Sequence, residues 1–184
     1  MALKGDRSIG PAAHTIDFFY NSTAEKGEVL IYSTAGSGSA QDDANAVVTR
    51  PAASASGQRP AGVLLNDVVN LDLTRQHINF QKDEMQQGGK VTLLQKGTIV
   101  TDMIESGASL TVGAPMYFKL DDTPGDTTTR GVFTPTNPPD SGTFLSDVTQ
   151  AHAFEEGSKA GYQVGVLESV LDADNFAKIR VDMP

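Results

Sequence analysis

The sequence predicts an all-β protein with a small β-barrel or β-sandwich core, an extended N-terminal arm and long loops. Short segments in which apolar and polar residues alternate are the first observation, since this period is typical of half-buried strands. The second is the presence of 18 Gly and 9 Pro among 184 residues, which leaves little room for long helices. The third is the position of these residues, at nearly every connection between the alternating segments.

The alternation is clearest between residues 88 and 120. Apolar residues alternate over 91–100, and Gly97 within that run indicates a turn or a bulge. The alternation resumes over 110–118, which predicts two short strands that turn a tight corner around a polar connection. Pro115 has no N–H to give to a ladder, so we expect it at a strand start, a bulge or an edge.

Several other segments have strand character. They lie at 14–20, 28–33, 46–49, 62–65 with a continuation through 68–73, 132–133, 162–169 and 177–182. The turn residues from Asp172 to Asn175 predict that the last two strands form a hairpin. The tripeptide at 62–64 recurs at 165–167, which we interpret as two similar barrel strands. Within 74–87, an extended pair at Ile78 and Phe80 and a helical turn remain alternatives.

Length and composition predict one structural domain with extensions. Residues 1–13 carry no apolar period and contain Gly5, Gly10 and Pro11, so we interpret them as an extended arm that becomes ordered on a neighbour. Residues 14–184 form the expected single β-barrel or β-sandwich domain, in which 121–160 is a region of Pro- and Gly-rich loops.

Charge and composition exclude several classes of partner and of site. A formal net charge of −9 opposes binding to nucleic acid, because neutralisation of phosphates supplies most of that affinity. No apolar run approaches the roughly 20 residues that span a bilayer, so no membrane partner is expected. The absence of cysteine excludes disulfides, thiolate metal ligands and cysteine nucleophiles.

Histidines and paired carboxylates are the first candidates for chemistry. His14, His77 and His152 are far apart and lack partners at the spacing of metal ligands. Asp172 and Asp174 begin like a calcium loop, but Phe176 follows at the next ligand position, so a solvated turn is favoured. The remaining acidic pairs are adjacent carboxylates, which in a strand point to opposite faces: Asp121 with Asp122, and Glu155 with Glu156.

The loop at 35–43 is the other candidate. Gly36 and Gly38 follow a strand as in a dinucleotide-binding motif, but Gln41 stands where the third glycine belongs and no periodic helix follows. Ser37 lacks the surroundings of a nucleophile elbow. We therefore expect no catalytic, cofactor-binding or metal-binding residues and no enzymatic activity.

Six segments taken in order resemble the capsid decoration, or cement, proteins of tailed bacteriophages. They are PAGVLLNDVVN at 60–70, LTRQHINFQKDE at 73–84, GGKVTLLQKGTIVTD at 88–102, VGAPMYF at 112–118, and the closing pair VGVLES and AKIRVD. The resemblance covers roughly residues 14–120 and 161–184.

The resemblance implies a structural virion protein. Such a protein is made in the host cytoplasm, binds the outer capsid surface as a homotrimer, and stabilises the shell by cementing neighbouring major capsid protein subunits. Its partners would be the major capsid protein and itself. The alternatives are another virion component, such as a tail or baseplate adaptor, and a ligand-binding β-module, for example for sugars.

Overall fold

The computed structural model describes residues 14–33, 47–51, 59–70, 84–119, 131–137 and 162–183. These residues form an all-β fold, as the sequence predicts. Its strands are β1 (His14–Tyr20), β2 (Val29–Tyr32), β3 (Val47–Thr49), β4 (Pro60–Leu64), β5 (Asp67–Val69), β6 (Glu84–Gln86), β7 (Lys90–Thr101), β8 (Pro115–Phe118), β9 (Phe133–Thr134), β10 (Gly165–Leu167) and β11 (Ala177–Asp182). Within this part of the chain, no helix has the length and apolar character needed to cross a membrane.

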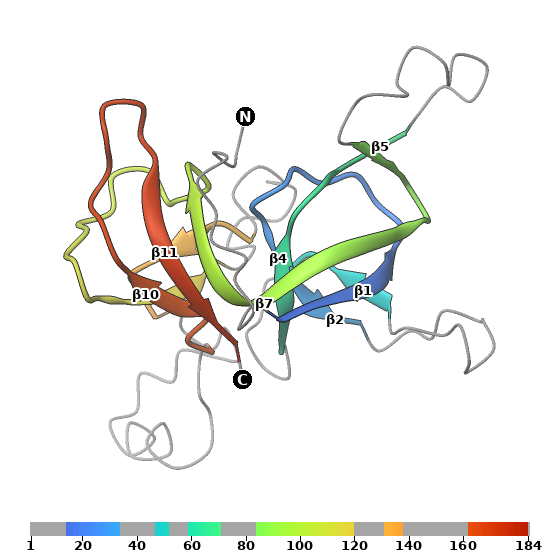
Figure 1. The fold of residues 1–184 in the computed structure, drawn as a ribbon, viewed down its shortest axis with the longest axis horizontal. Helices are drawn as coiled ribbons and strands as arrows, with labels where there is room; N and C mark the ends of the chain where they lie inside the picture. Colours follow the sequence, from blue (N-terminus) through green and yellow to red (C-terminus); the bar gives the residue numbers. More distant parts are fainter. Residues whose placement is uncertain are drawn as a thin grey trace, which may run out of the picture.

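Two barrels share strand β7. A continuous sheet of nine strands runs in the order β1-β3-β2-β4-β7-β11-β10-β8-β9, and β1 also pairs with β7. That pairing closes β1, β3, β2, β4 and the first half of β7 into what we call the first barrel. The second barrel contains the rest of β7 with β11, β10, β8 and β9, and a bridge from Ile104 to Phe133 closes it. Figure 1 shows the two lobes, with β7 running through both.

A bulge in β7 allows this strand to serve both barrels. Thr15 of β1 pairs with Leu94 and His14 pairs with Lys96, so Gln95 is an additional residue without a partner opposite. Beyond one additional residue, the side chains that would have pointed to one face of the strand point to the other. Val91 and Leu93 therefore point into the first barrel, whereas Ile99 points into the second.

Each barrel has its own core, and β2 and β4 contribute to both. Leu30 of β2 is buried in the first barrel, while its neighbours Val29 and Ile31 are buried in the second core. In β4 the residue Ala61 stands opposite the register shift between Leu30 and Ile31, and it points into the first barrel. Because each fully buried Leu or Ile contributes roughly 1.5–3 kcal/mol, contacts of β2 and β4 with the second core stabilise the union of the barrels.

Several predicted elements are confirmed. Strand β1 has the predicted bounds, and β10 and β11 form the terminal hairpin, with Val166 opposite Arg180. Pro115 is the first residue of β8, one of the places expected for a residue without an N–H. Of the predicted segment 132–133, Phe133 begins β9 and Val132 precedes it. Ile78 and Phe80 lie outside the described residues, and the short strand β6 that follows them was not predicted.

The predicted strand over 91–100 is confirmed as part of β7, a single strand of 12 residues that pairs with β11 from Lys96 to Thr101. The interruption expected at Gly97 is a bulge at Gln95. The second predicted strand, over 110–118, is too long, because β8 begins only at Pro115. The Ala114 amide donates to the Thr111 carbonyl over 3.0 Å and Gly113 has a φ of 87°, so the chain turns there before β8 begins.

The recurring tripeptide begins with a glycine that allows close contact between strands. A Cβ at Gly165 would lie 2.5 Å from the Arg180 carbonyl oxygen, and one at Gly62 would lie 2.5 Å from the Cβ of Leu93. Both glycines are therefore required by packing against a neighbouring strand.

Replacement of Gly165 with alanine should destabilise the protein by about 1–3 kcal/mol, because the new methyl group forces β10 away from β11. The control is Val166→Ala on the next residue, whose side chain is only half-buried and should change the free energy of unfolding by less than about 1 kcal/mol. Denaturant unfolding measures both. Equal stability of Gly165→Ala and the unmodified protein would contradict this packing.

Candidate interaction surface

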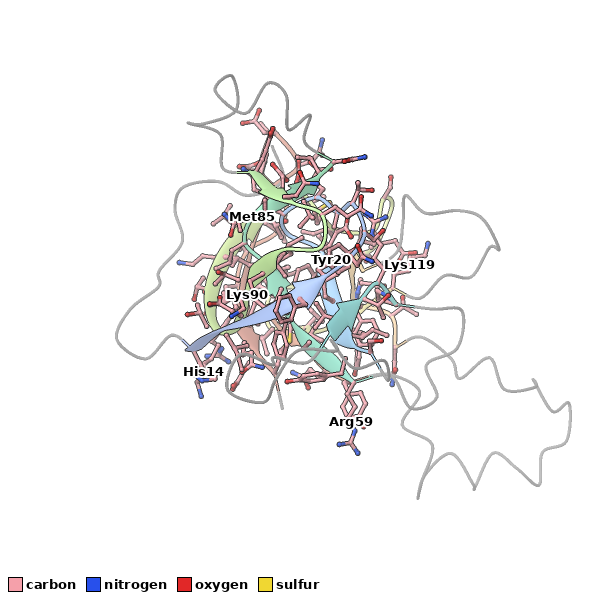
Figure 2. The ribbon with its side chains drawn as sticks, turned by 90° about the vertical axis from the view of Figure 1, so that its right-hand side faces the viewer. His14, Tyr20, Arg59, Met85, Lys90 and Lys119 are labelled. Atoms are coloured by element: carbon pink, nitrogen blue, oxygen red, sulfur yellow. The ribbon has the colours of Figure 1, made fainter. Side chains whose placement is uncertain are left out.

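Of the three histidines that the sequence offers as candidate metal ligands, His14 lies in the described part of the chain, at the surface. It lies at the outer edge of the first barrel, away from the buried Tyr20 (Figure 2). Its Nδ1 donates to Oε1 of Gln95 over 2.7 Å. His77 and His152 lie outside the described residues. In the parts of the chain that the structure describes, no group of three or more His, Asp or Glu side chains could hold a metal ion.

Asp172 forms the turn of the terminal hairpin. Its Oδ1 accepts hydrogen bonds from the backbone amides of Asp174 and Phe176, both over 2.9 Å. Asn175 adopts a φ of 65°, which asparagine tolerates better than most residues. The turn interpretation is thus confirmed for this segment. The other candidates of the sequence, which are Gly36, Ser37, Gly38, Gln41, Asp121, Asp122, Glu155 and Glu156, lie outside the described residues.

Gln95 connects four segments at the junction of the barrels. Besides the contact with His14, its Nε2 donates to the Ala61 carbonyl over 3.0 Å and to the Tyr32 hydroxyl over 3.3 Å. Its own carbonyl accepts from the Met183 amide over 3.0 Å. The bulged residue therefore joins β1, β2 and β4 to the end of β11.

A buried ion pair lies at the end of the first barrel. Glu28 is 3% exposed, and Arg50 binds it through two nitrogens, with Nε donating to Oε2 over 2.6 Å. Burial lowers the pKa of Arg50, but the hydrogen bonds and the charge of Glu28 outweigh it, and the pKa is raised above its usual value. The Glu25 amide donates to Glu28 over 3.0 Å. Such a pair, once assembled, is costly to break from one side.

A shallow groove of about 300 Å³ borders this ion pair, and its lining includes residues 23–25, Arg50 and strand β5. Asp67 in the groove accepts from the backbone amide of Lys26 over 2.8 Å and lies 3.6 Å from its Nζ. These polar contacts fix the turn between β1 and β2 against β5. We assign them a structural role.

Among the described residues, the three most exposed large hydrophobic side chains lie on two segments of the second barrel. Val112, Val170 and Leu171 are 58%, 53% and 41% exposed, and we call these three residues the apolar tip. Backbone hydrogen bonds join their two segments, from Gly113 to the Leu167 carbonyl over 2.8 Å and from Leu167 to the Ala114 carbonyl over 3.0 Å. In Figure 1 these two segments are the connection between β10 and β11 and the yellow loop beside it.

Sequence reasoning missed the apolar tip. It placed Val112 in a strand and gave no role to Val170 and Leu171. A usable signal was present, because an apolar pair directly before the turn residues at 172–175 must lie near the exposed end of a hairpin.

A second ion pair stabilises the end of β9. Lys119 Nζ lies 3.0 Å from Oε1 of Glu105, and the buried Thr134 hydroxyl donates to Oε2 over 2.6 Å. The hydrogen bond from Thr134 is the main cause that holds the pKa of Glu105 below its usual value. Burial raises this pKa, and Lys119 lowers it further.

A solved structure shares this fold. The chain is similar to a chain from the capsid of Myoviridae phage XM1, with a TM-score of 0.54 and 12% sequence identity over 99% of this chain and 92% of that chain. No protein-family model matches the sequence. No curated protein matches it at a significant level.

Thr134→Val should raise the pKa of Glu105, because it removes the main hydrogen bond to the ionised carboxylate. The folded-state pKa is below the unfolded value of about 4.3, so the stabilisation is present above that pH and is lost as the pH falls through the folded-state pKa. The variant should therefore be less stable at neutral pH, and this pH-dependent difference should vanish in acid. Titration of the Glu105 carboxyl by NMR measures the pKa, with Thr98→Val as the control. An unchanged titration midpoint in Thr134→Val would contradict the assignment.

Proposed function

We propose that this protein decorates the outside of a tailed-phage capsid and stabilises it by cementing neighbouring major capsid protein subunits. The fold shared with a chain from the capsid of Myoviridae phage XM1, over 99% of the present chain, is the observation that carries the proposal. It agrees with the resemblance of the segments at 60–70, 73–84, 88–102 and 112–118 to cement proteins.

The architecture suits a protein that bridges a seam. The 12 residues of β7 extend over up to about 40 Å, and the strand is hydrogen-bonded in both barrels. The side chains of β2 and β4 in the second core, and the hydrogen bond from the Met183 amide to the Gln95 carbonyl, hold the two barrels together. A body of this length that resists bending can transmit load between two subunits.

The energetic role follows from the number of copies on a shell. Even a micromolar contact contributes about 8 kcal/mol per site, and rupture of the shell must overcome many such sites. Extended segments add interface area without a larger core. We include the arm at residues 1–13 and the loop region at 121–160 in the proposal as such extensions of a single domain.

The proposal gives the protein a structural role without catalysis. Its partners are the major capsid protein and two further copies of itself, in a homotrimer on the outer capsid surface. The closed barrels leave a limited number of strand edges, and assembly around a threefold axis would cover those that remain.

Heads that carry the protein should retain DNA to a higher temperature than heads that lack it, because each bound copy adds a binding free energy that rupture must overcome. The measurement is DNA release against temperature for both kinds of head, with occupancy determined by gel densitometry. The control adds the purified protein back to the bare heads, which should restore the higher temperature. Coincident release curves at full occupancy would exclude cementing and favour the role of a tail or baseplate adaptor.

A further inference from the structure

We propose that the groove beside strand β5 binds the Arg180 side chain of a second copy of this chain. The inference rests on the proposed function for the number of copies that assemble, and it names the surfaces through which they meet. The shape of the groove and the charges of both surfaces follow from the structure itself.

The groove has an apolar floor that is fixed before any partner binds. Ala24 is 8% exposed and Val68 is 1% exposed, and reciprocal backbone hydrogen bonds of 2.8 and 3.0 Å join them. Glu25 and Asp67 line the groove beside this floor. Apolar surface next to a carboxylate suits the long stem and the charged end of an arginine, and a preorganised site loses little conformational entropy on binding.

The groove retains a negative charge that favours a basic guest. Arg50 binds Glu28 through two nitrogens, and Lys26 lies 3.6 Å from Asp67, so these charges neutralise one another. Glu25 is exposed and has no ion-pair partner in the described part of the chain. It interacts with Arg50 through charge alone, and Glu28 already holds the nitrogens of that residue.

Arg180 is an exposed cation on the outer face of the second barrel. Within the described ranges its side chain has no ion-pair partner. The residues directly opposite it on the neighbouring strands, Val166 and Thr98, carry no charge. The other charged residues near it on β7, β10 and β11 form ion pairs, Lys178 with Glu168 over 3.9 Å and Lys96 with Asp182 over 3.4 Å. The guanidinium is therefore available to a partner, and the acidic chain itself offers a complementary one.

The positions of the two surfaces favour contact between copies in a ring. The groove belongs to the first barrel and Arg180 to the second, so the contact is head-to-tail, and such contacts form a ring when the rotation closes. Arg59 is the other exposed arginine without an ion-pair partner among the described residues. It lies at the opposite end of the first barrel from the groove, beside the last residue of β2, and points away from the molecule (Figure 2). A contact through Arg59 would stack first barrels in a line.

Exchange of the two charges is the first test, with the oligomeric mass of the full-length protein measured by light scattering over a range of concentrations. Glu25→Arg and Arg180→Glu should each weaken assembly at least tenfold, because each places like charges together. The variant that carries both changes restores the attraction and should assemble as the unmodified protein does. Arg59→Glu makes the same change of charge at an exposed position and should leave assembly unchanged. Thermal unfolding checks the fold of each variant.

Cross-linking gives a second test that also works on heads. The chain contains no cysteine, so introduced thiols react without background. With a short bismaleimide, the variant with Glu25→Cys and Arg180→Cys should form covalent species of up to three copies, both in solution and on decorated heads. The variant with Glu25→Cys and Arg59→Cys should not.

The outcomes separate this inference from the proposed function. Equal masses of Arg180→Glu and Arg59→Glu, or equal cross-linking of the two cysteine variants on heads, would overturn the contact and leave cementing intact. If Glu25→Arg weakens binding to heads without a change of mass, the groove binds a basic side chain of the shell protein and the inference is wrong. Failure of the unmodified protein to bind heads would overturn cementing, whereas rescue of assembly by the double charge exchange would still support the contact.

Discussion

The bulge at Gln95 is the constraint on which the two-barrel architecture depends. A regular strand presents one face to one core, but the additional residue in β7 exchanges its faces halfway along. The amide side chain at this position supplies hydrogen bonds to His14, Ala61 and Tyr32 that a regular strand would not offer. One strand can therefore close the first barrel against β1 and the second against β11.

The mechanical properties of the protein follow from that shared strand. Movement of one barrel against the other would have to break the pairing of β7 or withdraw the side chains of β2 and β4 from the second core. Close contacts at Gly62 and Gly165 hold the neighbouring strands in register on both sides. The ion pair of Glu28 with Arg50 and that of Glu105 with Lys119 fix loops at the ends of the barrels. The apolar tip thus lies on a rigid support.

Local patterns in the sequence predicted part of the local structure correctly. The aromatic and β-branched run HTIDFFY gave the bounds of β1, and the turn residues after Leu171 gave the terminal hairpin, because both depend on neighbours in the chain. The continuous β7 and the two closed barrels depend on pairing with β1 and β11, which lie about 80 residues away on either side. The alternation of apolar residues gives no information on such partners. The prediction that Val112 lies in a strand was wrong for a related reason, because the exposure of a side chain depends on the whole folded chain.

The most direct test of the account is a cryo-electron microscopy reconstruction of heads that carry the protein at full occupancy. The account predicts density for the two-barrel body on the outer surface, grouped in threes around threefold or quasi-threefold positions, with each copy in contact with two or more major capsid protein subunits. Density confined to the portal or the tail, or copies that each contact a single subunit, would contradict the central claim that the protein cements the shell.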